Sequence, residues 1–233
     1  MKILVLGGFG FIGTHVTQRL NELEHETIAA SRRSGTDLFD LESINECLRL
    51  NKPHIIINCA ANVGSVNYVS EYAADVISSN IQMAVNLYKS VANYCPQAKI
   101  INPLSNCSYP GESDYQKENE WLIGDVHDSV FSYGNAKRII YLIAKCYQKQ
   151  FGIISSNFLI PNTFGPGDSL DPNKTHALNG MIVRMINAKI NNDVYDMALI
   201  RKGLDISVDN ADSKKETMLL VGDFTSINST PLT

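Results

Sequence analysis

A tyrosine and a lysine four positions apart carry the clearest chemical signal in this sequence. They are Tyr133 and Lys137, in the stretch FSYGNAK of residues 131–137. This spacing places both side chains on one face of a helix and within one turn of each other. An ammonium near a phenol favours the phenolate, so we expect the phenol pKa to fall from about 10 towards neutrality. Such a tyrosine can pass a proton to or from a substrate oxygen during hydride transfer.

The spacing is not specific by itself, because Tyr141 and Lys145 have the same separation. Position favours the first pair. Tyr133 opens its expected helix beside small residues, which would let a flat cofactor ring come close. Tyr141 lies two turns further along that helix, where a packing or surface role is the simpler interpretation.

Three glycines at spacing three, in the sequence GGFGFIG of residues 7–13, follow the first apolar run of the chain. The run before them predicts a strand and the run after them a helix, so the glycines form the turn between the two. Such a turn brings the backbone close to a pyrophosphate, and the helix N-terminus holds the negative charge. The pattern predicts a dinucleotide site. The expected cofactor contacts at this turn are Gly7, Gly10, Phe11, Ile12 and Gly13.

The residues after the second expected strand bear on which dinucleotide binds. An acidic side chain there would bind the ribose hydroxyls and repel a 2'-phosphate, but the chain shows Ser31, Arg32 and Arg33 instead. Two guanidinium groups beside a hydroxyl suit a phosphate dianion, which favours NADP and keeps NAD as the alternative. The alternative interpretation of these residues is a solvated basic turn. Asp40 has two open roles, as an acceptor for the adenine amino group or as the cap of the next helix.

Short apolar runs alternate with helical patterns over the first 160 residues. Strands are expected at 2–6, 27–30, 55–57, 99–104 and 153–160, and helices at 13–23, 41–50, 72–94 and 133–150. Strands buried on both faces and separated by helices predict an α/β fold, with a Rossmann-type, doubly wound parallel sheet. The pattern changes after residue 160. We therefore expect a dinucleotide-binding domain over 1–160 and a smaller substrate lobe over 161–233, with a helix at about 175–190.

Composition narrows the classes of function. The formal net charge of -4, without a long run of Lys and Arg, argues against a nucleic-acid partner. No apolar run approaches the about 20 residues of a membrane-spanning helix, so we expect no membrane role. The five cysteines are scattered and lack metal-ligand spacing. Reduced thiols, a cytoplasmic location and no metal site are the simplest expectations.

Two further segments extend the pattern of motifs. The sequence NCAA of residues 58–61 follows the third expected strand, and Ser105 ends the next one. With the glycine turn and the Tyr133-x-x-x-Lys137 pair, these segments resemble the extended short-chain dehydrogenase/reductase family. Within it, the similarity is greatest to the GDP-L-fucose synthase branch, which epimerises and then reduces GDP-4-keto-6-deoxymannose. That similarity rests on residues 60–64, 105–110, the Tyr133 helix and 161–176, and extends over about residues 1–190.

The resemblance implies a role for each of these positions. Ser105, Tyr133 and Lys137 would reduce a keto group, and Cys107 and His176 would be the acid/base pair of an epimerisation. A keto group acidifies the neighbouring carbons, and a thiol of pKa about 8.5 or an imidazole of about 6.5 can exchange protons with them. By the same resemblance Ala60 and Ala61 would contact the cofactor, Asn162, His176 and Arg184 the substrate, and Asn80 would be structural.

The sequence leaves simpler alternatives open. Cys107 can be a small core residue, His176 a solvated loop residue and Arg184 an exposed helix residue. Members of the family continue past the length of this chain, and residues 193–233 do not align with their substrate lobe, so we expect that lobe to be incomplete.

The resemblance therefore implies an NADP-dependent epimerase/reductase that acts on a nucleotide-diphosphate sugar. The alternatives are a redox-neutral, NAD-dependent nucleotide-sugar 4-epimerase and a non-catalytic NADP-binding subunit. The resemblance also implies a homodimer, in which the expected helices at 72–94 and 133–150 form the contact.

Overall fold

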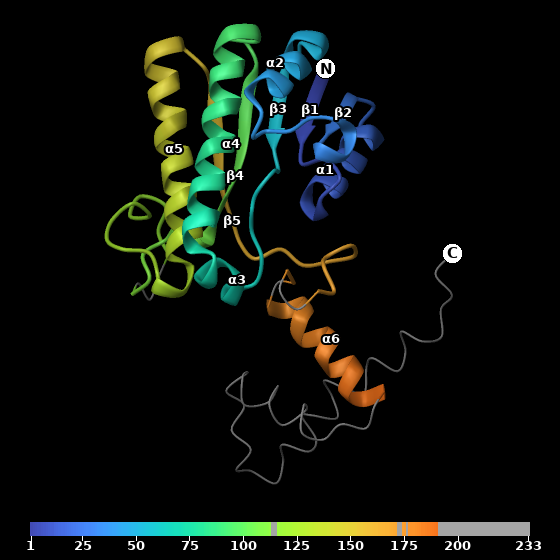
Figure 1. The fold of residues 1–233 in the computed structure, drawn as a ribbon, viewed down its shortest axis with the longest axis vertical. Helices are drawn as coiled ribbons and strands as arrows, with labels where there is room; N and C mark the ends of the chain where they lie inside the picture. Colours follow the sequence, from blue (N-terminus) through green and yellow to red (C-terminus); the bar gives the residue numbers. More distant parts are fainter. Residues whose placement is uncertain (113–115, 172–173, 176, 191–233) are drawn as a thin grey trace. The chain divides into compact units, whose positions relative to one another are not determined.

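The computed structural model describes residues 1–112, 116–171, 174–175 and 177–190. Its helices and strands alternate along the chain (Figure 1). They are β1 (Lys2–Leu6), α1 (Phe11–Glu22), β2 (Glu26–Ala30), α2 (Leu41–Asn51), β3 (Ile55–Asn58), α3 (Val66–Glu71), α4 (Ala73–Tyr94), β4 (Lys99–Ser105), α5 (Phe131–Phe151), β5 (Ser155–Ile160) and α6 (Ala177–Ile190). Short 3-10 helices η1 (Arg32–Ser34), η2 (Asn106–Ser108) and η3 (Asp128–Val130) lie between them.

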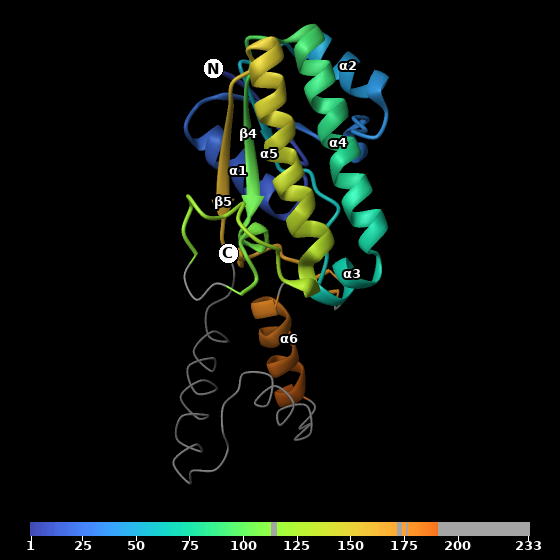
Figure 2. The same ribbon diagram turned by 90° about the vertical axis from the view of Figure 1, so that its left-hand side faces the viewer.

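The five strands form one parallel sheet in the order β2-β1-β3-β4-β5. From β1 the chain moves to one side to form β2, and then to the other side to form β3, β4 and β5. Right-handed crossovers therefore place α1 on one face of the sheet and α2, α4 and α5 on the other, as Figure 2 shows. This arrangement confirms the predicted Rossmann-type, doubly wound parallel sheet.

The largest core cluster joins the strands to the helices α2 and α4. Its fully buried members include Leu4, Ile56 and Ile100 from three neighbouring strands, and Leu48 and Leu87 from the two helices. Burying side chains of this size contributes about 1.5–3 kcal/mol each, so the centre of the sheet is a rigid support for the loops that follow its strands.

The order of the strands locates a crevice. The direction of winding reverses between β1 and β3, and ligands of open parallel sheets bind at the carboxyl ends of the strands at this point. The glycine turn follows β1, and the segment from Cys59 onwards follows β3. The fold therefore predicts a ligand site between the ends of β1 and β3.

The chain divides into two compact units, Met1–Asn179 and Gly180–Thr233. The sheet and its helices belong to the first unit, and the described part of the second is the remainder of α6. The division at residue 160 that the sequence indicates stays a prediction. In the described part of the chain, no helix combines the length and the apolar character that crossing a bilayer requires.

Candidate active site

The glycine turn is folded so that Gly7, Gly8 and Gly13 have no room for a side chain. Gly7 has a φ of +71°, and a Cβ there would lie 2.7 Å from the backbone nitrogen of Ala60. A Cβ on Gly13 would lie 2.1 Å from the carbonyl oxygen of Gly7. Gly10 is the N-cap of α1 and has no side chain to cap its first turn. The backbone N–H groups of that turn therefore face the crevice without a capping side chain, as an anion site requires.

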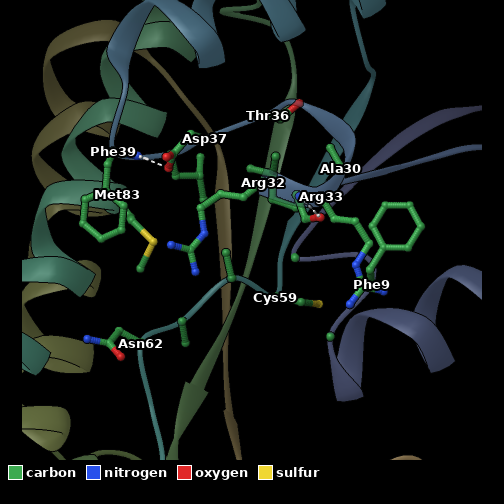
Figure 3. A pocket seen from close by; sticks show the side chains of 17 residues that line it. Phe9, Ala30, Arg32, Arg33, Thr36, Asp37, Phe39, Cys59, Asn62 and Met83 are labelled. Atoms are coloured by element: carbon green, nitrogen blue, oxygen red, sulfur yellow. Dashed lines mark hydrogen bonds between the residues drawn. The ribbon is translucent and has the colours of Figure 1, made fainter.

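A cavity of about 590 Å³, here called the first cavity, opens beside this turn (Figure 3). Its walls come from the turn itself, from the segment that follows β2 and from the segment that follows β3. Six of the residues predicted to bind a cofactor line it, namely Gly7, Gly10, Arg32, Arg33, Ala60 and Ala61.

The two arginines are presented by the short helix η1. The Ser31 hydroxyl accepts a 3.1 Å hydrogen bond from the backbone N–H of Arg33, and the Ser34 hydroxyl accepts a 2.9 Å bond from the N–H of Ser31. This capping box holds Arg32 and Arg33 at the cavity, as Figure 3 shows. Within the described residues neither arginine forms an ion pair, and the carboxylate of Asp37 lines the same cavity.

Asp40 is not among the residues that line the first cavity. Its Oδ1 accepts a 3.0 Å bond from the N–H of Glu42, which makes it the N-cap of α2. Of the two predicted roles, the structure gives it the helix cap. The cavity wall holds Asp37 instead, three residues earlier, and Asp37 accepts a 3.0 Å bond from the N–H of Phe39.

Sequence reasoning also missed several apolar residues of the first cavity. Phe9, Phe39 and Met83 line it, and Phe9 and Phe39 are about half exposed. Phe9 lies within the glycine turn, and an aromatic residue at this place is the signal that could have marked it, since a flat apolar surface there is free to stack on a ring. Met83 comes from helix α4, far along the chain, and no local pattern indicates it.

A second cavity of about 420 Å³ adjoins the first. Gly10, Cys59 and Ala61 line both, so the two form neighbouring parts of one groove. The second cavity brings together the predicted residues Phe11, Ile12, Ser105, Cys107, Tyr133, Lys137 and Asn162, which come from separate segments of the chain.

Tyr133 and Lys137 lie on the first two turns of α5, as predicted. The Lys137 ammonium lies 5.3 Å from the centre of the Tyr133 ring and donates a 3.0 Å hydrogen bond to the carbonyl of Pro103 in β4. Lys137 is only 5% exposed, because α5 packs over the end of β4. The lysine is thus fixed between the helix and the sheet.

The electrostatics of this pair differ from the sequence-based expectation. Burial raises the pKa of Tyr133 above its usual value, and the nearby Cys107 raises it further. Burial lowers the pKa of Lys137 to about 8, although Cys59 and Cys107 oppose this. Desolvation penalises the charged form of each group and, at Lys137, outweighs the opposing effect of the two cysteines. Tyr133 therefore keeps its proton at neutral pH and is arranged as a proton donor.

Ser105 and Cys107 lie on the turn that ends β4. The Ser105 hydroxyl accepts a 3.2 Å bond from the N–H of Cys107, which lies in η2. Helix α5 approaches this turn closely, since a Cβ on Gly134 would lie 2.3 Å from the carbonyl oxygen of Cys107. Only glycine fits there, and the contact brings the thiol-bearing turn beside the start of the tyrosine helix.

Asn80 supports the segment that passes between the two cavities. Its side chain donates a 2.8 Å bond to the carbonyl of Asn62 and accepts a 3.1 Å bond from the N–H of the same residue. With Asn80 only 2% exposed, this pair of bonds fixes the backbone that follows β3. A structural role for Asn80 agrees with these contacts.

The described structure does not test two of the predicted substrate contacts. His176 lies outside the described residues, and Arg184 is exposed on α6 in the second compact unit. Their contacts with a substrate stay predictions. Among the described residues, no group of three or more His, Cys, Asp or Glu side chains could hold a metal ion.

The groove has the features that a dinucleotide requires. The backbone of the glycine turn leaves no room for a Cβ at Gly7 or Gly13, the first turn of α1 offers N–H groups, and two arginines lie beside it. These groups match a pyrophosphate and a further phosphate, while the second cavity is large enough to receive a ring near Tyr133.

Comparison with known proteins gives curated relatives at low sequence identity. A probable GDP-L-fucose synthase of Drosophila melanogaster is 28% identical over 187 residues, which are 79% of this chain and 58% of that protein. The GDP-L-fucose synthase of Sinorhizobium fredii is 28% identical over 190 residues, 81% of this chain and 60% of that protein. The chain thus spans about three fifths of the length of these curated relatives.

Solved structures share the fold. A GDP-L-fucose synthetase from Naegleria fowleri bound to NADP superposes with a TM-score of 0.73 at 23% identity, over 82% of this chain and 63% of that chain. A GDP-6-OMe-4-keto-L-xylo-heptose reductase from C. jejuni gives a TM-score of 0.75 at 21% identity, over 93% of this chain and 61% of that chain. The model of the NAD dependent epimerase/dehydratase family matches residues 3–204. Since this match runs from the first strand to beyond α6, the protein belongs to the NAD dependent epimerase/dehydratase family.

Proposed function

We propose that this chain is an NADP-dependent enzyme that epimerises and reduces a 4-keto-6-deoxy nucleotide sugar. One observation carries the proposal: a single cavity beside the glycine turn is lined by Ser105, Cys107, Tyr133 and Lys137. The names of the relatives support GDP as the nucleotide. NADP as the cofactor is supported by the two arginines at the first cavity and by the Naegleria synthetase, which has NADP bound.

In this proposal the first cavity holds the cofactor by its phosphates. The backbone of residues 7–13 and the start of α1 receive the pyrophosphate, and Arg32 and Arg33 receive the 2'-phosphate. The cofactor, when bound, supplies hydride to a carbonyl carbon. As that carbon accepts the hydride, the carbonyl electron pair moves to oxygen, which takes the proton of Tyr133. Lys137 then stabilises the phenolate that remains.

Epimerisation precedes reduction in this scheme. A base removes a proton from a carbon next to the keto group, and the electron pair of the broken C–H bond becomes an enolate. The hydroxyls of Ser105 and Tyr133 donate hydrogen bonds to the enolate oxygen. A second group returns a proton on the opposite face, which inverts the carbon. Cys107 takes one of these two roles, and the resemblance assigns the other to His176.

The proposal is tested by mixing the full chain with NADPH and GDP-4-keto-6-deoxymannose. We expect NADPH to be oxidised, and Tyr133→Phe to lower the rate by about 10²–10⁴-fold while NADPH still binds. Binding of NADPH without its consumption would identify a non-catalytic subunit. Interconversion of sugars with tightly held NAD and no net oxidation would identify a 4-epimerase. Either result would contradict the proposal.

We also propose that the protein is a homodimer in which α4 and α5 of two copies meet. These helices lie side by side, and both carry exposed apolar side chains, with Leu142 on α5 50% exposed and Tyr94 on α4 40% exposed. Light scattering should give twice the chain mass. We expect Leu142→Glu to shift the mass towards the monomer, and a mass that equals one chain before substitution would contradict the proposal.

A further inference from the structure

Arg138 ties together the two elements that carry the residues of the proposed reaction. It follows Lys137 directly on α5, and it is not among the residues that line either cavity. Its Nε donates a 2.8 Å hydrogen bond to the carbonyl of Ser108, the last residue of η2. Its Nη1 donates a 2.6 Å bond to the carbonyl of Gly124, in the segment that returns from η2 to α5. One side chain thus links the tyrosine helix to both ends of the intervening loop.

The bond to Ser108 acts on the turn that holds the predicted thiol. Ser108 is fully buried, and its hydroxyl donates a hydrogen bond to the carbonyl of Ser105. The Ser105 hydroxyl in turn accepts the N–H of Cys107. Arg138 is therefore connected to Ser105 and Cys107 through two further hydrogen bonds, all within four consecutive residues.

A second contact point lies one helical turn earlier. Gly134 directly follows Tyr133 in α5. Because Gly134 has no side chain, α5 can approach the carbonyl of Cys107 closely. The close approach prevents the turn from moving towards the helix. The hydrogen bonds of Arg138 prevent it from moving away. Together the two contacts define the separation between η2 and α5.

The chemistry of the link requires a guanidinium. The planar guanidinium of an arginine donates hydrogen bonds in two fixed directions at once and keeps its charge when partly buried. The ammonium of a lysine carries its charge and its donors on one nitrogen atom. Burial lowers the pKa of Arg138, and Asp125 opposes that effect. A third nitrogen, Nη2, is buried without a hydrogen-bond partner in the described part of the chain, so the side chain is not an ordinary solvated surface arginine.

We propose that Arg138 is a positioning residue that sets the place of the Cys107 thiol relative to the Tyr133 hydroxyl. Its consequence for catalysis, namely efficient proton transfer at the sugar carbons, rests on the proposed function. The positioning itself concerns the protein alone. It is therefore measured first without a substrate, through the reactivity of the thiol.

The first test follows the alkylation of each cysteine by iodoacetamide in the full chain, with mass spectrometry as the readout. We expect Arg138→Met to accelerate alkylation of Cys107 about tenfold, because the charge-assisted hydrogen bond to its turn at Ser108 and the one to the returning segment at Gly124 are both lost. Arg138→Lys keeps one bond and should give an intermediate rate. The rate at Cys146, which is exposed on α5, should not change. Lys145→Met, an exposed substitution on the same helix, is the matched control and should not alter the rate at Cys107.

Two outcomes would overturn the proposal. One is a rate at Cys107 in Arg138→Met that stays within about twofold of the unsubstituted protein, since the lost bonds should matter more than that. The other is a parallel acceleration at Cys47 and Cys95, which are buried in the main core and report a general loosening of the fold.

The second test measures exchange of the sugar hydrogens with heavy water, in the presence of NADPH and the keto sugar. Arg138→Met should lower the maximal exchange rate by about ten- to a hundredfold with little change in KM or in the Kd of NADPH, because the groups are misplaced rather than removed. Unchanged exchange in this variant contradicts the proposal. The alkylation rates can change as expected in Arg138→Met while the unsubstituted chain catalyses no exchange. In that case the proposed function fails and the positioning role of Arg138 stands.

Discussion

The two cavities of the groove are built in different ways. The first takes its phosphate-facing parts from two short stretches, residues 7–13 and 31–34, in which backbone shape and local capping set the geometry. The second takes single side chains from the ends of β3, β4 and α5 and from the segment after β5. The phosphate-facing part of the first cavity is thus formed by consecutive residues. The second cavity forms only after the sheet and helices have assembled.

The largest expected effect comes from breaking the first cavity at its tightest point. In Gly13→Ala the new Cβ would lie 2.1 Å from the carbonyl oxygen of Gly7, so α1 must move away from the turn. We expect a loss of about 3 kcal/mol or more in the free energy of unfolding and no measurable NADPH binding. Urea unfolding and a cofactor titration check both.

Gly10→Ala is the matched control in the same turn. Its Cβ would lie 3.3 Å from the same oxygen, a contact that a small shift relieves. The free energy of unfolding should then change by less than about 1 kcal/mol. Equal unfolding curves for Gly13→Ala and the unsubstituted chain would show that close packing of α1 on the turn is unimportant.

The next largest effect is expected from a substitution that changes only the second cavity. Cys107→Ser replaces the thiol with a far weaker acid of similar size. We expect exchange of the sugar hydrogens with heavy water to fall by about 10²–10³-fold, as for loss of an acid/base group, while the Kd of NADPH stays the same. Undiminished exchange would remove Cys107 from the acid/base pair.

A substitution confined to the first cavity should give the opposite result. Replacing both Arg32 and Arg33 with Met removes the two charges that face the predicted 2'-phosphate. The affinity for NADPH should fall about 10- to 100-fold, the size of one or two lost charged hydrogen bonds, and the affinity for NADH should hardly change. Calorimetric titration with each cofactor measures the ratio. A fall in both affinities alike would point to a general effect on the turn.

The smallest expected effect concerns pH and the second cavity. Lys137 has a pKa lowered to about 8 by burial, so between about pH 8 and 10.5 the unfolded chain binds more protons at this residue than the folded chain does. The contribution of Lys137 to the free energy of unfolding should therefore rise with pH in this interval, so the difference in that free energy between the unsubstituted chain and Lys137→Met should change by about 2 kcal/mol. Below pH 8 both states are protonated and the slope disappears. Lys145→Met, at an exposed position, should keep the pH dependence of the unsubstituted chain. The same pH dependence of the free energy of unfolding in Lys137→Met would refute this account.

Much of the fold could be predicted because its signals are local. The apolar runs and the helical patterns predicted the alternation of strands and helices, and the parallel sheet followed from strands buried on both faces. The helix expected at 72–94 agrees with α4 (Ala73–Tyr94) to within one residue, whereas the short helix α3 (Val66–Glu71) was not expected.

The candidate site was predicted less evenly. The positions from motifs, such as Gly7 and Tyr133, do line the groove. The wall of the first cavity holds Asp37 where the sequence offered Asp40, because the cap of α2 turns Asp40 towards its own helix. The role of Arg138 could not be predicted from the sequence, because its hydrogen-bond partners lie 14 and 30 residues away and form no pattern with it.

The sequence by itself determined the glycine turn, the basic turn and the spacing of Tyr133 and Lys137, because each depends on neighbours within a few residues. Only the tertiary structure decided that Tyr133 keeps its proton and that Lys137 is held by Pro103. The physical reason is desolvation. The charge state of a side chain follows from how much water the distant elements α5 and β4 exclude when they pack together, and no local spacing contains that information.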